Sequence, residues 1–216
     1  MSAESGIRTF RDAGGLWEDY AVEDVATPEA WKRDPALVQR FYNEIRKQVM
    51  EAQPNAAHLA LSKLEAKYEV VVITQNIDDL HERAGTNNII HLHGEIRKAR
   101  SSRYEDLVYD IDGWEITSGS LCEKGFPLRP FIVWFGEQVP MMTPSIIQVQ
   151  SADIFIIIGT SLEVYPAASL LDFVRPEIPK YFIDPGAENK NYIKNLTVIK
   201  EKAGSAVPVL VDKLLS

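Results

Sequence analysis

Short, unbroken runs of aliphatic and aromatic residues recur along this chain, and segments with helical periodicity lie between many of them. Unbroken runs are typical of strands covered on both faces, as in a parallel sheet, because a strand with one solvated face alternates apolar and polar residues. Strands that alternate with helices predict a doubly wound, Rossmann-like α/β domain. The runs that we assign to strands are residues 70–73, 131–135, 154–158 and 181–183, with a weaker one at 196–199.

The clearest helix signal covers residues 37–49, where an apolar residue stands at every fourth position. Asp34-Pro35 precedes it and supplies an N-cap followed by a proline at the first helical position. Thr27-Pro28 and Thr143-Pro144 carry the same start signal. Further helical faces lie at residues 59–64 and 206–215.

Two stretches interrupt the alternation of strands and helices. Residues 14–66 have a helical pattern without strands, and residues 97–129 are polar, irregular and broken by glycines. We interpret both as insertions that build a small second lobe. The chain then forms a single domain over residues 1–216.

The composition is that of an ordinary globular chain of 216 residues, of which 45% are apolar and 25% charged. Its 23 basic and 31 acidic residues give a net charge of −8, which repels phosphate backbones and anionic membranes, so we expect no nucleic-acid or membrane partner. The single cysteine, Cys122, excludes an intramolecular disulfide. We therefore expect a cytoplasmic protein.

Polar or flexible residues follow three of the predicted strands. Residues 74–78 (TQNID) come after the first strand, 159–161 (GTS) after the third and 184–186 (DPG) after the fourth. Ligands of open parallel sheets bind at the carboxyl ends of the strands. Polar residues after one strand are commonly part of a turn or a helix cap, but such residues after three strands of one sheet favour a nucleotide-binding cleft.

Residues 91–94 (HLHG) end a possible strand, and strict alternation would put His91 and His93 on one face. Histidine is well matched to proton transfer near neutral pH, although a lone histidine is more often structural. No cysteine or carboxylate stands at a supporting spacing, so we expect no zinc on these histidines. Glycines beside arginines in residues 5–17 form either a loop over an anionic ligand or a flexible end.

Taken in order, these segments resemble motifs of the sirtuins, the NAD-dependent protein lysine deacylases, over essentially the whole chain. The closest similarity is to the bacterial type related to desuccinylases and demalonylases. The segments are residues 2–7 (SAESGI) with 9–11 (TFR), 74–81 (TQNIDDLH), 91–94 (HLHG), 133–137 (VWFGE) and 159–168 (GTSLEVYPAA).

The resemblance implies that an acyl-lysine oxygen attacks the nicotinamide-bearing ribose carbon of NAD, so that nicotinamide leaves and O-acyl-ADP-ribose and free lysine form. His93 would be the general base, while Asn76 and Asp78 would hold the nicotinamide amide and order the reacting ribose. The implied NAD-binding residues are Phe10, Arg11, Gln75, Asn76, Ile77, Asp78, Gly159, Thr160, Ser161, Asp184 and Ala203. The implied residues for an acylated lysine peptide, bound as an added strand, are Tyr42, Val133, Trp134, Phe135, Leu162 and Val164.

Two departures from the family pattern concern zinc and the acyl group. Sirtuins normally carry four zinc cysteines, whereas this chain has only Cys122, and Ser101 stands where the first would align. We therefore expect no metal, and an insertion held by packing of Leu107, Val108, Trp114 and Phe126. The desuccinylase pattern pairs a tyrosine with an arginine three residues on, but Tyr42 is followed by Ile45, unless Arg46 takes the arginine's place.

The third departure is that the glycine-rich phosphate loop of the family, and the strand before it, are absent from the sequence. We expect that Met1 is an internal residue taken for the start, and that the two strands at 70–73 and 154–158 expose unpaired edges. A form without that strand should be poorly stable and weak in NAD turnover.

Two functions of different classes follow from these observations. The first is NAD-dependent deacylation of protein lysines, which the presence of His93, Asn76 and Asp78 favours. The alternative is a catalytically weak module of the same fold that binds NAD or an acyl-peptide, which the missing phosphate loop favours. NAD glycohydrolysis or ADP-ribosyl transfer in the same cleft would also fit.

Overall fold

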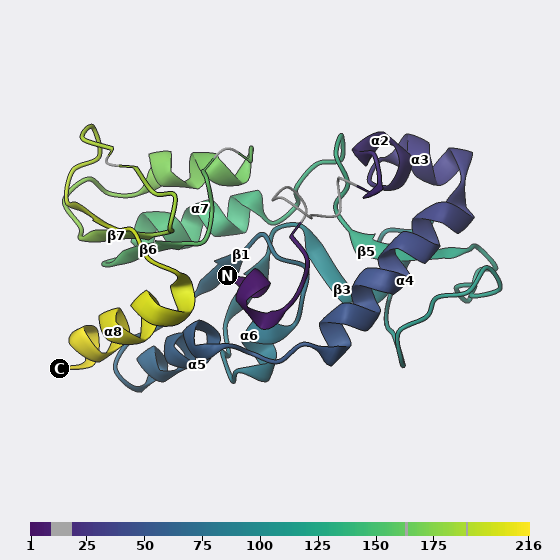
Figure 1. Ribbon diagram of the computed structural model, residues 1–216. Helices are drawn as coiled ribbons and strands as arrows, with labels where there is room; N and C mark the ends of the chain where they lie inside the picture. The colour runs from purple at the N-terminus through teal and green to yellow at the C-terminus, as the bar shows by residue number, and fades with distance from the viewer. Residues whose placement is uncertain (10–18, 163, 189) are drawn as a thin grey trace.

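Figure 1 presents the computed structural model of the chain, which describes residues 1–9, 19–162, 164–188 and 190–216. The helices are α2 (Val22–Val25), α3 (Pro28–Arg33), α4 (Pro35–Glu51), α5 (Ala56–Lys63), α6 (Leu80–Arg83), α7 (Met142–Ser151) and α8 (Ala203–Leu215), with 3-10 helices η1 (Ser2–Ser5), η2 (Leu64–Ala66) and η3 (Ala167–Phe173). The strands are β1 (Val72–Thr74), β2 (Ile89–His91), β3 (Gly94–Ser101), β4 (Val108–Asp110), β5 (Leu128–Ile132), β6 (Phe155–Ile158), β7 (Lys180–Ile183) and β8 (Leu196–Ile199).

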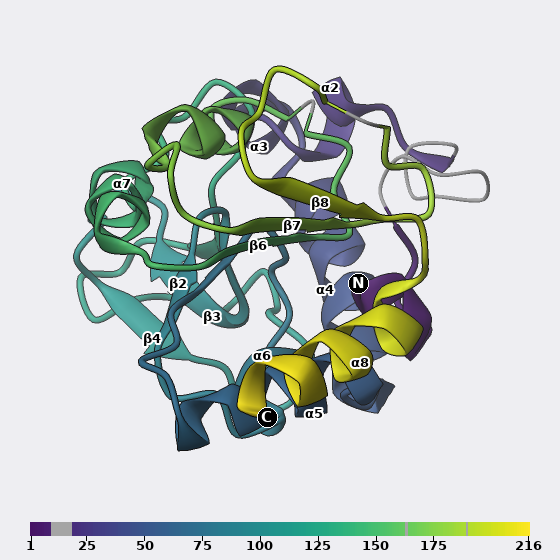
Figure 2. The same cartoon turned by 90° about the vertical axis from the view of Figure 1, so that its left-hand side faces the viewer.

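Four of the five apolar runs assigned to strands lie in parallel strands, as the sequence predicts. β6, β7 and β8 pair in parallel in that order, and β1 pairs in parallel with β2. Helices cover both faces of the sheet: α5 and α8 pack on one and α7 and η3 on the other (Figure 2). This arrangement confirms the doubly wound α/β class.

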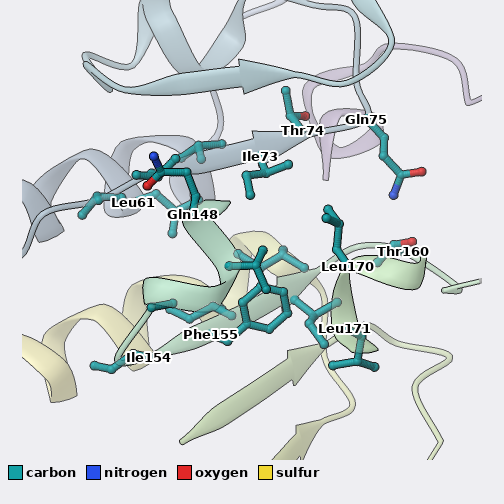
Figure 3. A pocket seen from close by; sticks show the side chains of 18 of the residues that line it. Leu61, Ile73, Thr74, Gln75, Gln148, Ile154, Phe155, Thr160, Leu170 and Leu171 are labelled. Carbon is teal, nitrogen blue, oxygen red and sulfur yellow. The ribbon is translucent and has the colours of Figure 1, made fainter. Parts of the chain in front are cut away.

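A slot separates the two parallel sheets. Among the described strands, β1 pairs only with β2 and β6 only with β7, so their facing edges carry no ladder hydrogen bonds. The slot is a cavity of about 630 Å³ lined by residues of both strands, and Figure 3 shows Ile73 and Phe155 on its opposite walls. The expectation of two unpaired edges is therefore confirmed.

The small lobe joins α2, α3 and α4 to an antiparallel sheet in the order β4-β3-β5 (Figure 1). The prediction that residues 131–135 form a strand of the parallel sheet is wrong, because β5 covers Leu128–Ile132 and pairs antiparallel with β3. Residues 97–129 are also less irregular than expected. A register shift between Gly94 and Ala99 breaks the alternation of β3, which is why the sequence pattern hides it.

Polar residues on one face of α4 hold the second insertion. Asn43 exchanges two hydrogen bonds of 3.0 Å with the backbone of Ile116, and Gln39 donates to the carbonyl of Leu128 at 2.9 Å. Arg46 donates to the carbonyls of Ile96 and Trp114. These side chains are buried because they satisfy backbone groups of the insertion.

The helix-start signals have different outcomes. Thr27 Oγ1 accepts from the backbone of Ala30 at 3.0 Å and Asp34 Oδ1 from that of Leu37 at 2.9 Å, so two predicted N-caps are confirmed. The start predicted at Thr143-Pro144 is wrong, since α7 begins at Met142. Pro144 fits there because the first turn of a helix leaves its N–H groups unpaired anyway. No helix in the described ranges is long and apolar enough to cross a membrane.

Candidate active site at the carboxyl ends of the strands

Residues that follow three parallel strands line one cavity of about 550 Å³. Asn76 and Asp78 reach it from the segment after β1, Gly159 from the end of β6 and Asp184 from the end of β7. Ile77, Ala203 and residues of η1 also line it. Gln75 and Thr160 lie at the adjoining end of the slot, where Figure 3 labels both.

The segment after β1 is held by hydrogen bonds on both sides. The Asn76 side chain donates to Ser2 Oγ at 2.8 Å, and its backbone N–H donates to Thr74 Oγ1 at 3.1 Å. Asp78 accepts from the backbone of Leu80 at 3.2 Å. Burial raises the pKa of Asp78, although hydrogen bonds from Ser2 and Leu80 oppose that effect.

Ser2 is a site residue that the sequence analysis does not single out. It is buried, it contacts Asn76, and it belongs to η1, which closes one side of the cavity. The only sequence signal for it is its position as the first residue of the first sirtuin-like segment.

His93 lies just beyond β2, which ends at His91. The prediction that the two rings share one face of a strand is therefore wrong. The Nδ1 atom of His93 contacts the carbonyl oxygen of Gln75 at 3.1 Å. Because a carbonyl only accepts, Nδ1 carries the proton, and Nε2 of the neutral ring keeps a lone pair. Burial lowers the pKa of His93, against the opposing effect of the Gln75 hydrogen bond. The ring is therefore suited to accept a proton at neutral pH.

His91 is turned to different partners. Its Nε2 lies 2.7 Å from Glu82 Oε1 and its Nδ1 lies 3.3 Å from the carbonyl oxygen of Asn76. Burial lowers the pKa of His91, but the Glu82 carboxylate outweighs burial and the net shift is upward. Glu82, His91 and Glu95 have potential ligand atoms within 4.8 Å of one another, but this group does not include His93.

The segment after β5 contacts the histidine loop. The backbone N–H of Val133 donates to the carbonyl of His93 at 3.0 Å, and that of Phe135 donates to the carbonyl of Ala26 at 3.0 Å. Trp134 is buried, whereas the Phe135 residue is 47% exposed. An exposed aromatic residue beside the histidine loop offers a surface for a peptide.

Tyr42 and Ile45 both lie on α4, but Ile45 lines a cavity of the site and Tyr42 does not. Tyr42 is buried, and its hydroxyl accepts from Trp134 Nε1 at 3.1 Å. Ile45 lines the 550 Å³ cavity beside Asn76. Arg46 does not line that cavity, because its guanidinium is bonded to backbone carbonyls of the insertion and to Asn43.

The structure says less about how the remaining predicted site residues contact the site. Leu162, with a positive φ of 60°, and Val164 are half-buried and follow Gly159 along the chain. Ser161 is exposed and lines neither cavity. Phe10 and Arg11 lie outside the described residues.

The second insertion is held differently from the way the sequence predicts. Val108 and Trp114 are about two-fifths exposed and so do not form its core, which contains buried Ile116 and Cys122 instead. The thiol of Cys122 donates to Ser101 Oγ at 3.4 Å. Around this contact, Lys124 lies over the ring of Tyr104 and Arg103 over the ring of Phe126, at 4.0 and 4.9 Å.

The chain is similar to known proteins over its whole length. The sequence model of the Sir2 family matches residues 1–166. The chain is 50% identical to an NAD-dependent protein deacylase of Bacteroides thetaiotaomicron, in an alignment that covers 100% of this chain and 94% of that protein. A protein of the same name from Helicobacter pylori (strain J99) is 49% identical, with 100% and 92% covered.

The fold of the chain is also similar to those of solved structures. A Sir2 homologue bound to NAD has a TM-score of 0.89 at 38% identity, covering 100% of this chain and 87% of that one. A Sir2 protein bound to a deacetylated p53 peptide and 3′-O-acetyl ADP ribose has a TM-score of 0.82 at 31% identity, covering 99% and 88%.

Proposed function

Because this chain belongs to the Sir2 family and is an NAD-dependent protein deacylase, we propose that His93 is its general base and that Asn76 and Asp78 order the reacting end of NAD. The observation that carries the proposal is the hydrogen bond from His93 Nδ1 to Gln75, which leaves Nε2 free to accept a proton. Burial keeps that ring neutral near pH 7.

The residues around the 550 Å³ cavity fit NAD. The cavity lies at the carboxyl ends of parallel strands, where open α/β sheets bind nucleotides. A Cβ at Gly159 would come within 2.7 Å of the Met1 nitrogen, so the close approach of these two residues at the edge of the cavity requires glycine. We assign NAD binding to Phe10, Arg11, Gln75, Asn76, Ile77, Asp78, Gly159, Thr160, Ser161, Asp184 and Ala203.

NAD supplies an electrophilic ribose carbon and nicotinamide as its leaving group. The protein supplies positioning and proton transfer. Asn76 and Asp78 are fixed by Ser2 and by the start of α6, which pre-organises their amide and carboxylate. His93 Nε2 takes the proton of a ribose hydroxyl, and burial of the ring favours its return to the neutral form.

The proposed partner is an acylated lysine peptide. It would lie as an extended strand beside residues 133–135, together with Leu162 and Val164. Because the N–H groups of residues 133–135 already donate within the protein, the peptide would bond to backbone carbonyls there, in a way that tolerates many sequences. The link from Val133 N–H to the His93 carbonyl supports this placement, because it sets the peptide segment directly beside the base.

We propose that the preferred acyl group is neutral. Ile45 lines the cavity where an arginine would be needed for an acidic acyl group, and Arg46 is bonded elsewhere. Loss of a charge-assisted partner for a buried carboxylate typically costs about 2–5 kcal/mol. Acetyl-lysine should therefore be favoured over succinyl- and malonyl-lysine.

A substrate panel tests this function. The protein is mixed with NAD and matched acetyl, succinyl and malonyl lysine peptides, and nicotinamide and product mass are followed. We expect acetyl removal to dominate, and Ile45→Arg to raise desuccinylation relative to deacetylation. Preference of the unmodified protein for succinyl-lysine would contradict the acyl assignment, and nicotinamide release without a peptide would indicate a glycohydrolase instead.

The proposal extends to the domain and its location. We assign residues 1–216 to one deacylase domain whose small lobe is built from insertions at about 14–66 and 97–129, although α5, within the first insertion, packs with α8 on the parallel sheet and not in the small lobe. A cytoplasmic location is supported by the single cysteine and the net charge of −8.

A further inference from the structure

A buried ion pair lies behind the segment to which we assign peptide binding. Arg129 of β5 contacts both carboxylate oxygens of Glu137, with Nη1 at 2.7 Å from Oε1 and Nη2 at 3.1 Å from Oε2. The two side chains are 5% and 20% exposed. A bidentate pair of this kind fixes the geometry of both partners, unlike an exposed pair of flexible side chains.

The pair grips the backbone of the segment between its two members. Glu137 Oε2 also accepts from the backbone N–H of Trp134 at 2.8 Å, and Arg129 Nη2 donates to the carbonyl of Ile132 at 2.8 Å. Gly136, at a φ of +87°, makes the turn that brings Glu137 back over Trp134. Both ends of the 132–137 turn are thus tied to one ion pair.

The same pair fixes the Trp134 side chain. The guanidinium carbon of Arg129 lies 3.3 Å from the ring centroid of Trp134, a stacked contact that a lysine cannot reproduce. On its indole nitrogen, Trp134 donates to the hydroxyl of Tyr42. The orientation of Tyr42 therefore depends on Trp134, and that of Trp134 depends on Arg129.

Charge interactions hold this arrangement at neutral pH. Burial raises the pKa of Glu137, but the hydrogen bonds and charge of Arg129 outweigh burial and keep the pKa below its ordinary value. Arg100 is a more distant partner of the same carboxylate, at 3.4 Å, and it also pairs with exposed Glu105. Arg100 contacts this turn through the Glu137 carboxylate.

We propose that Arg129 and Glu137 are positioning residues for the acyl-lysine peptide: they hold the 132–137 turn, together with buried Trp134 and the Tyr42 bonded to it, in the conformation that receives the peptide. The inference rests on the proposed role of these residues in peptide binding. Neither side chain touches NAD or the reacting atoms in this account, so their effect should fall on the peptide and not on the cofactor.

The test uses Glu137→Gln and Arg129→Lys, with Arg100→Gln as the matched control. For each full-length variant, kcat and the KM values for an acetyl-lysine peptide and for NAD are measured, together with binding of a fluorescent acetyl-lysine peptide without NAD. Loss of a hydrogen bond to a charged group predicts that the peptide KM and dissociation constant rise about tenfold or more. The KM for NAD should stay within about twofold, and Arg100→Gln should resemble the unmodified protein.

A purely structural role gives a different result. It would lower the melting temperature and kcat together and leave the peptide KM unchanged, which would overturn the inference. Arg129→Lys keeps both charges of the pair, so it remains informative if Glu137→Gln does not fold. An equal rise in the peptide KM from Arg100→Gln would also overturn the inference. If the unmodified protein binds no acetyl-lysine peptide, it is the proposed function that fails.

Discussion

The two histidines at the end of β2 lie two residues apart but have opposite electrostatic surroundings. His91 pairs with the Glu82 carboxylate and has a raised pKa, whereas His93 contacts only a backbone carbonyl in the bonds described and has a pKa lowered by burial. A general base must be neutral before it can accept a proton. At the scale of single residues, this difference is what assigns the base to His93.

The lowered pKa of His93 predicts the pH dependence of the reaction. As pH falls, the ring protonates only below its ordinary pKa of 6.5, so the acidic limb of kcat/KM should have its midpoint below 6.5. The profile is that of kcat/KM for NAD, measured with the acetyl-lysine peptide at a saturating concentration. His91→Gln is the control and should keep the same midpoint. A midpoint above 6.5, or a limb that disappears in the control, would contradict the assignment.

At the scale of elements, the second insertion is tied to α4 and to a local polar and aromatic cluster. Asn43 and Arg46 bond its backbone, and Cys122 contacts Ser101 within it. These contacts hold the insertion through protein groups, whereas a tetrahedral zinc site would need four ligands.

We therefore expect no stoichiometric zinc in the purified protein, and no change in melting temperature on addition of a strong chelator. Elemental analysis and thermal unfolding check this directly. Asn43→Ala serves as a positive control for the insertion, since it leaves two buried backbone groups of Ile116 unpaired and should lower the melting temperature. One tightly held zinc per chain would show that the insertion is held in another way.

The sequence predicts the parallel strands and the segments that follow them well, because buried strands and glycine-containing turns leave local signals. It predicts the small lobe poorly for a physical reason. Asn43 and Arg46 have the polarity of a solvated helix face, and only the backbone of the insertion, about 70 residues away for Ile116, makes them buried. The contact between Ser2 and Asn76 is likewise non-local, so no periodicity reveals it.

At the scale of the whole molecule, the slot divides the parallel sheet into two parts. The edges of β1 and β6 face each other across a cavity of about 630 Å³. Unpaired strand edges lose ladder hydrogen bonds and promote aggregation. We expect that a strand filling the slot would stabilise the sheet.

One strand placed in parallel between β1 and β6 would satisfy both edges. Met1 lines the slot, so an apolar strand fused before it through a glycine-rich turn would lie within reach. We expect this fusion to raise the melting temperature by about 5 °C or more and to reduce aggregation. A fusion with two prolines in the same strand is the control, because proline cannot complete the ladder. No gain over that control would mean that the slot is already satisfied.

The proposed mechanism depends above all on His93, and one measurement tests it most directly. The protein and its His93→Ala variant are compared for formation of nicotinamide and deacylated peptide from NAD and an acetyl-lysine peptide, with NAD affinity and melting temperature measured in parallel. We predict one nicotinamide per peptide deacylated by the unmodified protein, and no deacylation by a variant that still folds and still binds NAD. Deacylation by the variant at the rate of the unmodified protein would contradict the account.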